Sequence, residues 1–197
     1  MKHSNFDVNA FGTGWAALLD ADRLPELGAG HPDAEITRRL GRVQLDFLFG
    51  DRPIVDNQSA QACLAGLWLW HDGLDASHAI SQNLHNRDGS FWHGIMHRRE
   101  PDYPNAKYWF RQVSAHPVYA PLLAAARELT SGVSQLESGL ARLTQGQTWD
   151  PFRFVDLCEA TYDSGSATEQ ICRQIARAEW QLLFQHCFAH AVGGEGS

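Results

Sequence analysis

Long apolar runs are absent from this sequence of 197 residues. No stretch approaches the roughly 20 apolar residues that a transmembrane helix needs. Residues 1–14 have neither the basic start nor the apolar stretch of a secretory signal. We therefore expect a cytoplasmic protein with no membrane partner.

Cysteine is also scarce. The sequence has four cysteines and no C-x-x-C pair; the four are Cys63, Cys158, Cys172 and Cys187. Each lies among apolar residues within a helical pattern, which is typical of buried thiols rather than of a disulfide framework or a cysteine metal site. We expect all four thiols to be reduced.

Lysine is scarce as well, and the protein has no net positive charge. Lys2 and Lys107 are the only lysines, so arginine supplies almost all of the 16 basic residues, and the formal net charge is −7. An acidic protein repels nucleic-acid phosphates unless it carries a compensating basic patch. We therefore expect no nucleic acid among its partners.

The common nucleophile and nucleotide motifs do not occur. The sequence has no G-x-S-x-G turn, no P-loop and no dinucleotide fingerprint. Its composition, with 44% hydrophobic and 20% charged residues, is that of one ordinary globular domain. We expect residues 1–197 to form a single domain with a loop near 144–151 and a flexible tail at 193–197.

Helical periodicity dominates what is present. Apolar residues recur at spacings of three and four along nearly the whole chain, and no period-2 alternation is long enough for a strand. The pattern predicts an all-α bundle of about seven to nine helices, with the two longest at its centre. The expected helices span about 12–22, 31–50, 58–85, 91–100, 104–115, 117–130, 132–144, 150–162 and 166–192.

A row of polar side chains interrupts the apolar stripe of the expected 58–85 helix. The row consists of His71, Asp75, His78 and Gln82, at positions i, i+4, i+7 and i+11. At about 100° per residue these side chains project from one face of a helix. Imidazole and carboxylate groups one turn apart can bind the same cation. Alternatively, the histidines are core residues that bond to each other, to Asp75 or to a tryptophan.

The expected 91–100 helix repeats this arrangement. His93, His97 and Glu100 lie one turn apart beside an apolar face. Because Glu100 precedes Pro101, a helical conformation is disfavoured there, and we assign Glu100 to acid or base catalysis. The two rows together predict one divalent metal ion, Zn, Fe or Mn, with ligands drawn from His71, Asp75, His78, His93 and His97.

A third set of polar residues lies on one face of the expected 166–192 helix. Glu179, His186 and His190 occupy positions i, i+7 and i+11. They could add a ligand to a site inside a bundle. A structural role is the commoner explanation for such residues.

The basic residues concentrate around the second histidine row. Arg98, Arg99, Lys107 and Arg111 form the only dense group of positive charge in the sequence. Arginine binds carboxylate and phosphate groups with two parallel hydrogen bonds, so this group predicts a small anionic substrate. The alternative is a structural network of ion pairs with nearby acidic residues.

One segment resembles known proteins. Residues 92–111 read WHGIMHRREPDYPNAKYWFR, and His116-Pro117 follows. This segment, with residues 71–82 and 179–184, resembles a group of bacterial and fungal helical proteins of uncharacterised function. The resemblance covers roughly half of the chain and implies no activity, cofactor or catalytic residue.

The residues favour a metal-dependent enzyme, a hydrolase, lyase or oxygenase that acts on a small anionic substrate. In this hypothesis the histidines bind the ion, the basic group holds the substrate and Glu100 moves a proton. Two other classes stay open. One is a metal-free binding protein for an acidic metabolite, and the other is a structural or partner-binding helical protein.

Overall fold

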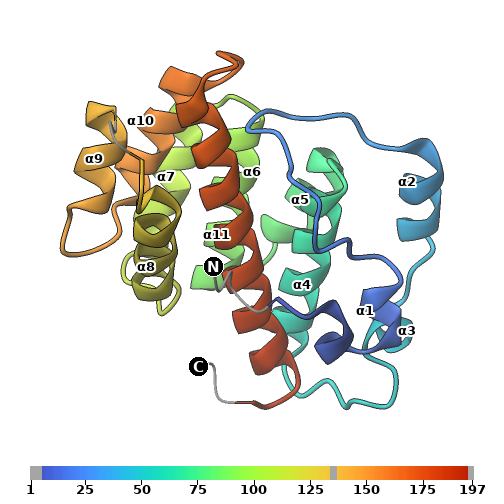
Figure 1. Ribbon diagram of the computed structural model, residues 1–197. Helices are drawn as coiled ribbons and strands as arrows, with labels where there is room; N and C mark the ends of the chain where they lie inside the picture. Colours follow the sequence, from blue (N-terminus) through green and yellow to red (C-terminus); the bar gives the residue numbers. More distant parts are fainter. Residues whose placement is uncertain (1–5, 134–136, 195–197) are drawn as a thin grey trace.

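The computed structural model describes residues 6–133 and 137–194 (Figure 1). Within these ranges the chain forms eleven α-helices and one short 3₁₀ helix, with no strand, and nine of the α-helices have seven residues or more. The predicted all-α fold is confirmed. The helices are η1 (Val8–Phe11), α1 (Thr13–Ala16), α2 (Ala34–Leu40), α3 (Leu45–Phe49), α4 (Asn57–Trp70), α5 (Leu74–Ser81), α6 (Arg87–Arg99), α7 (Tyr103–Val113), α8 (Tyr119–Thr130), α9 (Ser138–Thr144), α10 (Pro151–Thr161) and α11 (Ala167–Ala191).

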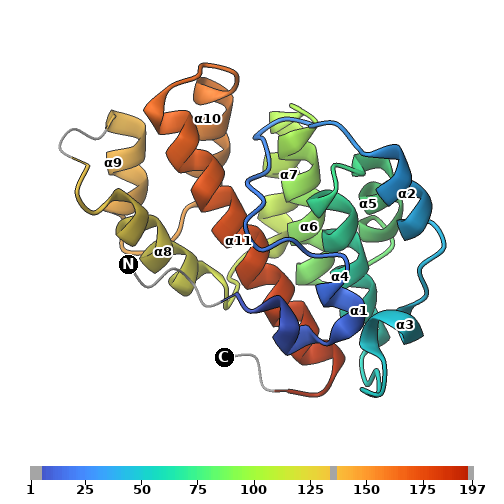
Figure 2. The same ribbon diagram turned by 45° about the vertical axis from the view of Figure 1, so that its right-hand side comes forward.

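The longest helix, α11, crosses the middle of the molecule. Figure 1 shows α8, α9 and α10 to one side of α11 and α1 to α5 to the other, and in the turned view of Figure 2 α8 and α9 again lie on the side away from α2 to α5. In detail α11 packs against α4 and α8, while α6 packs against both α5 and α7, and α7 also contacts α10. The central position predicted for the 166–192 helix is confirmed. The order α5, α6, α7, α10 determines which side chains meet between helices.

Aromatic side chains fill the contact between α4, α6 and α11. The rings of Trp70 and Trp180 lie 4.3 Å apart, and Trp180 stacks on Phe184 with an interplanar angle of 11°. The Trp180 indole N–H donates a 2.8 Å hydrogen bond to the carbonyl of Gly66. These rings are almost completely buried. Truncating a buried ring of this size to alanine typically costs about 3–5 kcal/mol, so the aromatic contact is a main source of stability.

The helix expected over 58–85 is wrong as one continuous element. The chain leaves the helix after Trp70, Asp72 takes a positive φ of 62°, and α5 begins at Leu74. Asp72 is held in this conformation because its carboxylate accepts hydrogen bonds from Arg99 Nη2 at 2.6 Å and Arg23 Nη2 at 2.7 Å. Aspartate tolerates the left-handed region better than most residues. Tertiary ion pairs therefore override the helical periodicity at this point.

Other expected boundaries move for local reasons. The 12–22 stretch forms only the short α1, which ends at Ala16, and the 31–50 stretch divides into α2 and α3. The 91–100 helix begins earlier, at Arg87, because the Asn86 side chain accepts a 2.8 Å hydrogen bond from the Gly89 N–H and caps the first turn. The expected 132–144 helix begins later, at Ser138, because Gly132 lies in a turn with a φ of 111° and Glu137 is the non-helical N-cap residue of α9. Residues 134–136 lie outside the described part. Most of the expected tail, 195–197, also lies outside it.

The structure agrees with the expectations for the cysteines and for membrane-spanning helices. All four cysteines are buried and free of disulfide bonds, as predicted. Burial raises the pKa of the Cys63 and Cys187 thiols well above the ordinary value. None of the helices in the described ranges combines the length and the apolar character needed to span a bilayer.

Candidate metal centre

Three of the predicted ligands converge. His78 on α5 meets His93 and His97 on α6, and one ligand nitrogen of each lies within 4.8 Å of the others. The His93 ring centroid is 4.7 Å from that of His78 and 4.8 Å from that of His97. Because His93 and His97 are one turn apart on α6, and α5 packs on the same face, the two helices bring three imidazoles to one point.

Helix α7 supplies the neighbours of this histidine cluster. The Trp109 ring stacks on His93 with a centroid distance of 3.9 Å and an interplanar angle of 14°. The Asn105 side-chain nitrogen lies 3.0 Å from His97 Nε2. Gly94 makes this close packing possible, because a Cβ at that position would lie 3.1 Å from the Phe110 ring. The cluster is therefore covered on the α7 side, while His78 remains partly exposed.

One nitrogen of the histidine cluster has no partner. His93 Nδ1 is buried and forms no hydrogen bond with the described residues. Burial, together with the nearby positive charges of protonated His97 and His78, lowers the pKa of His93 to about 3. Burial also lowers the pKa of His97, against the opposing effect of Glu100. His93 is thus neutral at pH 7, which is the form that donates a lone pair to a metal ion.

Glu100 contacts the cluster from outside. It follows α6 as the C-cap residue, and its Oε2 lies 3.1 Å from His97 Nδ1. The Glu100 side chain is half-exposed. A carboxylate that accepts a hydrogen bond from one nitrogen of a histidine orients the ring and makes the other nitrogen a better metal ligand. The predicted acid or base Glu100 therefore lies beside the predicted ligands.

His71 and Asp75 do not join the cluster. His71 is the C-cap residue of α4, outside any helix, and its Nε2 lies 2.7 Å from the Leu18 carbonyl oxygen. Asp75 lies in the first turn of α5 and is exposed. The break at Asp72 and Gly73 separates His71 from the α5 residues, so the expected single row of ligands does not exist.

Two predicted substrate-binding arginines are occupied by carboxylates of the protein. Arg98 forms a buried ion pair with Glu179, and its guanidinium carbon lies 4.6 Å from the Phe154 ring centroid. Arg99 contacts Asp72 at 2.6 Å and donates to the carbonyl oxygens of Gly28 and Leu69. Arg98 and Arg99 thus belong to a network of ion pairs, which was the alternative to binding an anionic substrate.

The other two predicted substrate-binding residues lie on α7. Lys107 forms an ion pair with Asp156 on α10. Arg111 is exposed, and its guanidinium carbon lies 5.8 Å from the Phe152 ring centroid. The four basic side chains consequently do not act as one group, because the fold sends Arg98 and Arg99 inward to different carboxylates.

A second cluster, Asp88, His116 and His186, was not predicted. Asp88 Oδ1 lies 2.8 Å from His116 Nε2 and 3.3 Å from His186 Nε2. His116 Nδ1 accepts a hydrogen bond from the Val118 N–H, so in the neutral ring the proton is on Nε2 and is donated to Asp88. Both nitrogens of His116 are therefore engaged. This cluster connects α6, the α7–α8 loop and α11 as a structural contact.

The pKa of Asp88 reflects these contacts. Burial by itself raises it, but the hydrogen bonds and positive charges of His116 and His186 outweigh burial and hold the pKa well below its usual range. No spacing in the sequence could have linked these three residues. His186 was noted only as a possible additional ligand, and Asp88 belonged to an expected turn.

Comparison with known proteins adds no further information about this site. No protein-family model, curated protein or solved structure matches the chain.

Proposed function

We propose that the chain is a metal-dependent enzyme whose ion is bound by His78, His93 and His97. The observation that carries this proposal is the approach of three imidazole nitrogens to within 4.8 Å of one another, with the buried Nδ1 of His93 left without a partner. An unbonded buried polar group costs about 1–3 kcal/mol. A metal ion bound to Nδ1 would remove that cost for His93.

The geometry suits a small divalent ion. Around tetrahedral Zn²⁺, with Zn–N distances of about 2.0–2.1 Å, ligand nitrogens are about 3.3 Å apart. The three nitrogens now lie within 4.8 Å of one another and would move closer together around the ion. Imidazole ligands favour zinc and iron over manganese. Three histidines also leave a fourth position open for water or substrate, as catalytic zinc sites do.

The donor set indicates the reaction class. A bound ion would supply a Lewis acid and lower the pKa of a coordinated water. Glu100 bonds to His97 and is half-exposed, so its carboxylate can orient that ring and accept a proton at the edge of the site. Three neutral ligands without a carboxylate favour hydrolase or lyase chemistry over an iron oxygenase, which typically uses two histidines and one carboxylate. A substrate with an anionic group suits the positive charge of the ion.

The proposal is tested by metal analysis of protein purified without a histidine tag. We expect stoichiometric metal after reconstitution with Zn²⁺ at neutral pH, measured by elemental analysis and titration calorimetry. His93→Ala should weaken zinc binding at least tenfold, because removing a supporting or direct ligand has effects of this size or larger. His85→Ala is the matched control, since His85 is exposed and lies outside the cluster.

Circular dichroism of both variants should match the parent, because neither change removes a helix. Failure of the parent protein to bind Zn²⁺, Fe²⁺ or Mn²⁺ would reject the metal-dependent enzyme. Equal zinc affinity of His93→Ala and His85→Ala would place any bound metal elsewhere in the chain.

A further inference from the structure

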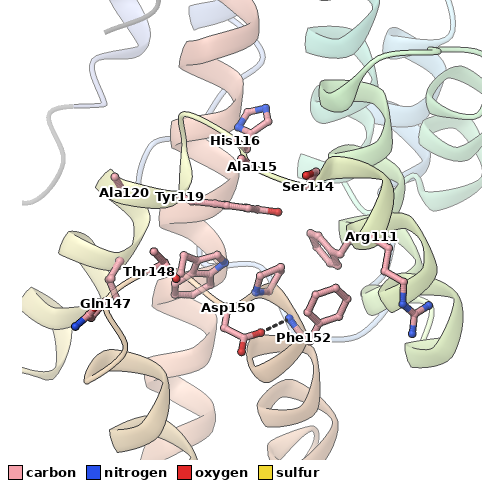
Figure 3. Close-up of a pocket in the computed structure, with 14 residues that line it drawn as sticks. Arg111, Ser114, Ala115, His116, Tyr119, Ala120, Gln147, Thr148, Asp150 and Phe152 are labelled. Carbon is pink, nitrogen blue, oxygen red and sulfur yellow. Dashed lines mark hydrogen bonds between the residues drawn. The ribbon is translucent and has the colours of Figure 1, made fainter.

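A cavity of about 760 Å³ lies between α7, α8 and the start of α10, and none of the three clustered histidines lines it. Figure 3 shows this pocket, with side chains from the three segments facing its interior. Its walls are largely aromatic or apolar, and they include Phe110, Tyr119, Leu123, Trp149 and Phe152. A volume of this size and apolar character is typical of a small-molecule site.

Two hydrogen-bond donors in the pocket wall have no partner. The hydroxyl of Tyr119 and the indole nitrogen of Trp149 are buried and form no hydrogen bond with the described residues. Figure 3 shows the Tyr119 ring crossing the pocket with its hydroxyl directed toward the α7 side. Burial, followed by the negative charges of Glu179 and Asp150, raises the pKa of Tyr119. Its hydroxyl therefore stays protonated and available as a donor.

The charged residues of the pocket favour an anion. The Asp150 carboxylate is already used, because it accepts from the backbone N–H groups of Phe152 and Arg153 and contacts the Arg153 guanidinium at 3.1 Å. The two nitrogens of His116 are engaged by Asp88 and Val118. Arg111, at the pocket edge, pairs with no carboxylate of the described residues. Among the buried polar side chains of the pocket wall, the two that lack a partner within the described residues are thus both donors, and Arg111 adds a cation at the pocket edge.

We propose that this pocket binds a small planar aromatic carboxylate. The aromatic ring would lie among Phe110, Trp149 and Phe152, where it buries apolar surface and stacks. The carboxylate would accept hydrogen bonds from the unpartnered donors and face the charge of Arg111, which is the anion-binding role predicted for that residue. The site does not depend on the metal proposed above, because Trp109 and Phe110 direct adjacent side chains of α7 toward the two different sites.

The first test uses 2-naphthoate as the probe and isothermal titration calorimetry with the full chain. We expect saturable binding in the millimolar range or tighter, and weaker binding of the neutral amide 2-naphthamide. Tyr119→Phe should weaken 2-naphthoate binding by about tenfold to a hundredfold, the range for a lost hydrogen bond to a charged group. Arg111→Gln should weaken it about two- to fivefold, because the side chain is exposed.

Two further variants separate this pocket from unspecific binding. Ala120→Trp introduces an indole at an exposed lining position on α8 and should block the probe without disturbing the core. Tyr108→Phe is the matched control, because Tyr108 is exposed and does not line the pocket. It should bind 2-naphthoate as the parent does.

The melting temperature of the ligand-free protein distinguishes a binding role of Tyr119 from a structural one. Because the hydroxyl has no partner in the free protein, Tyr119→Phe should melt at the same temperature as the parent or higher. A lower melting temperature would mean that the hydroxyl stabilises the fold, and would contradict the proposal. So would absence of 2-naphthoate binding, or equal affinity for Tyr119→Phe, Ala120→Trp and Tyr108→Phe.

A chelator control distinguishes failure of the pocket proposal from failure of the metal proposal. The titration is repeated after treatment with a chelator, and 2-naphthoate affinity should not change. Loss of binding after chelation would place the probe at the metal and overturn the assignment to this pocket. Retained binding in a protein that never binds metal would leave the pocket standing while the metal-dependent enzyme is rejected.

Discussion

The buried ion pair between Arg98 and Glu179 connects α6 to α11 and allows a quantitative test. The two side chains are 2% and 0% exposed, and the guanidinium uses both terminal nitrogens on the carboxylate. Glu179→Gln keeps the shape of the side chain and removes its charge. The Arg98 guanidinium then stays buried without a counter-charge. The change thereby isolates the electrostatic contribution without creating a cavity.

The expected loss is large for a single substitution. Removing one partner of a buried pair typically costs about 3–5 kcal/mol, because the remaining charge is uncompensated in a poorly polarisable interior. For a domain of this size, 1 kcal/mol corresponds to about 2–4 °C in melting temperature, so we expect Glu179→Gln to melt about 6–20 °C lower. Glu128→Gln, on the exposed face of α8, should stay within about 0.5 kcal/mol of the parent.

The assay is urea unfolding monitored by circular dichroism, and the double variant Arg98→Met/Glu179→Leu is measured beside Glu179→Gln. Because both charges are then absent, the double variant should recover much of the stability lost in Glu179→Gln. Two results would refute the reasoning. One is a Glu179→Gln protein within 1 kcal/mol of the parent, and the other is a double variant less stable than Glu179→Gln. The first would also reopen Arg98 for substrate binding.

Two other contacts yield predictions of the same kind. Asp88→Asn should lower the free energy of unfolding at pH 7 by about 1.5–3 kcal/mol. Because the folded pKa of Asp88 lies below the unfolded value of about 3.9, this difference from the parent should persist above pH 4 and shrink as the pH falls toward 2. A difference that stays constant across this pH range would contradict the assignment. Gly66→Ala should cost about 1–3 kcal/mol in chemical unfolding, because the new Cβ would lie 2.7 Å from the buried Trp92 ring. Gly41→Ala serves as the control, because the new Cβ would meet only two backbone oxygens, at 3.4 and 3.8 Å. Equal effects of the two glycine changes would show that the close contact with Trp92 is not the cause.

Local signals in the amino-acid sequence were sufficient for the fold class and for most helices. Helical periodicity predicted helices close to α10 and α11 because it reflects residues within one or two turns, and in the structure the side chains of Asp150 and Ser166 cap these two helices. The pairing of His93 with His97 was predictable for the same reason, since residues four apart on a helix are neighbours wherever the helix lies. The meeting of His78 with that pair followed from assuming that consecutive helices pack together.

Contacts between distant segments decided the rest. The helix break at Asp72 follows from ion pairs with Arg23 and Arg99, and Arg98 turns inward because Glu179, 81 residues away, is its buried partner. The contact of Asp88 with His186 and the cavity beside Tyr119 likewise join separate helices. Periodicity reports which face of a helix is apolar but not which helix covers it. Only the packed structure therefore determines which polar side chains are neutralised inside the protein and which remain free to bind a ligand.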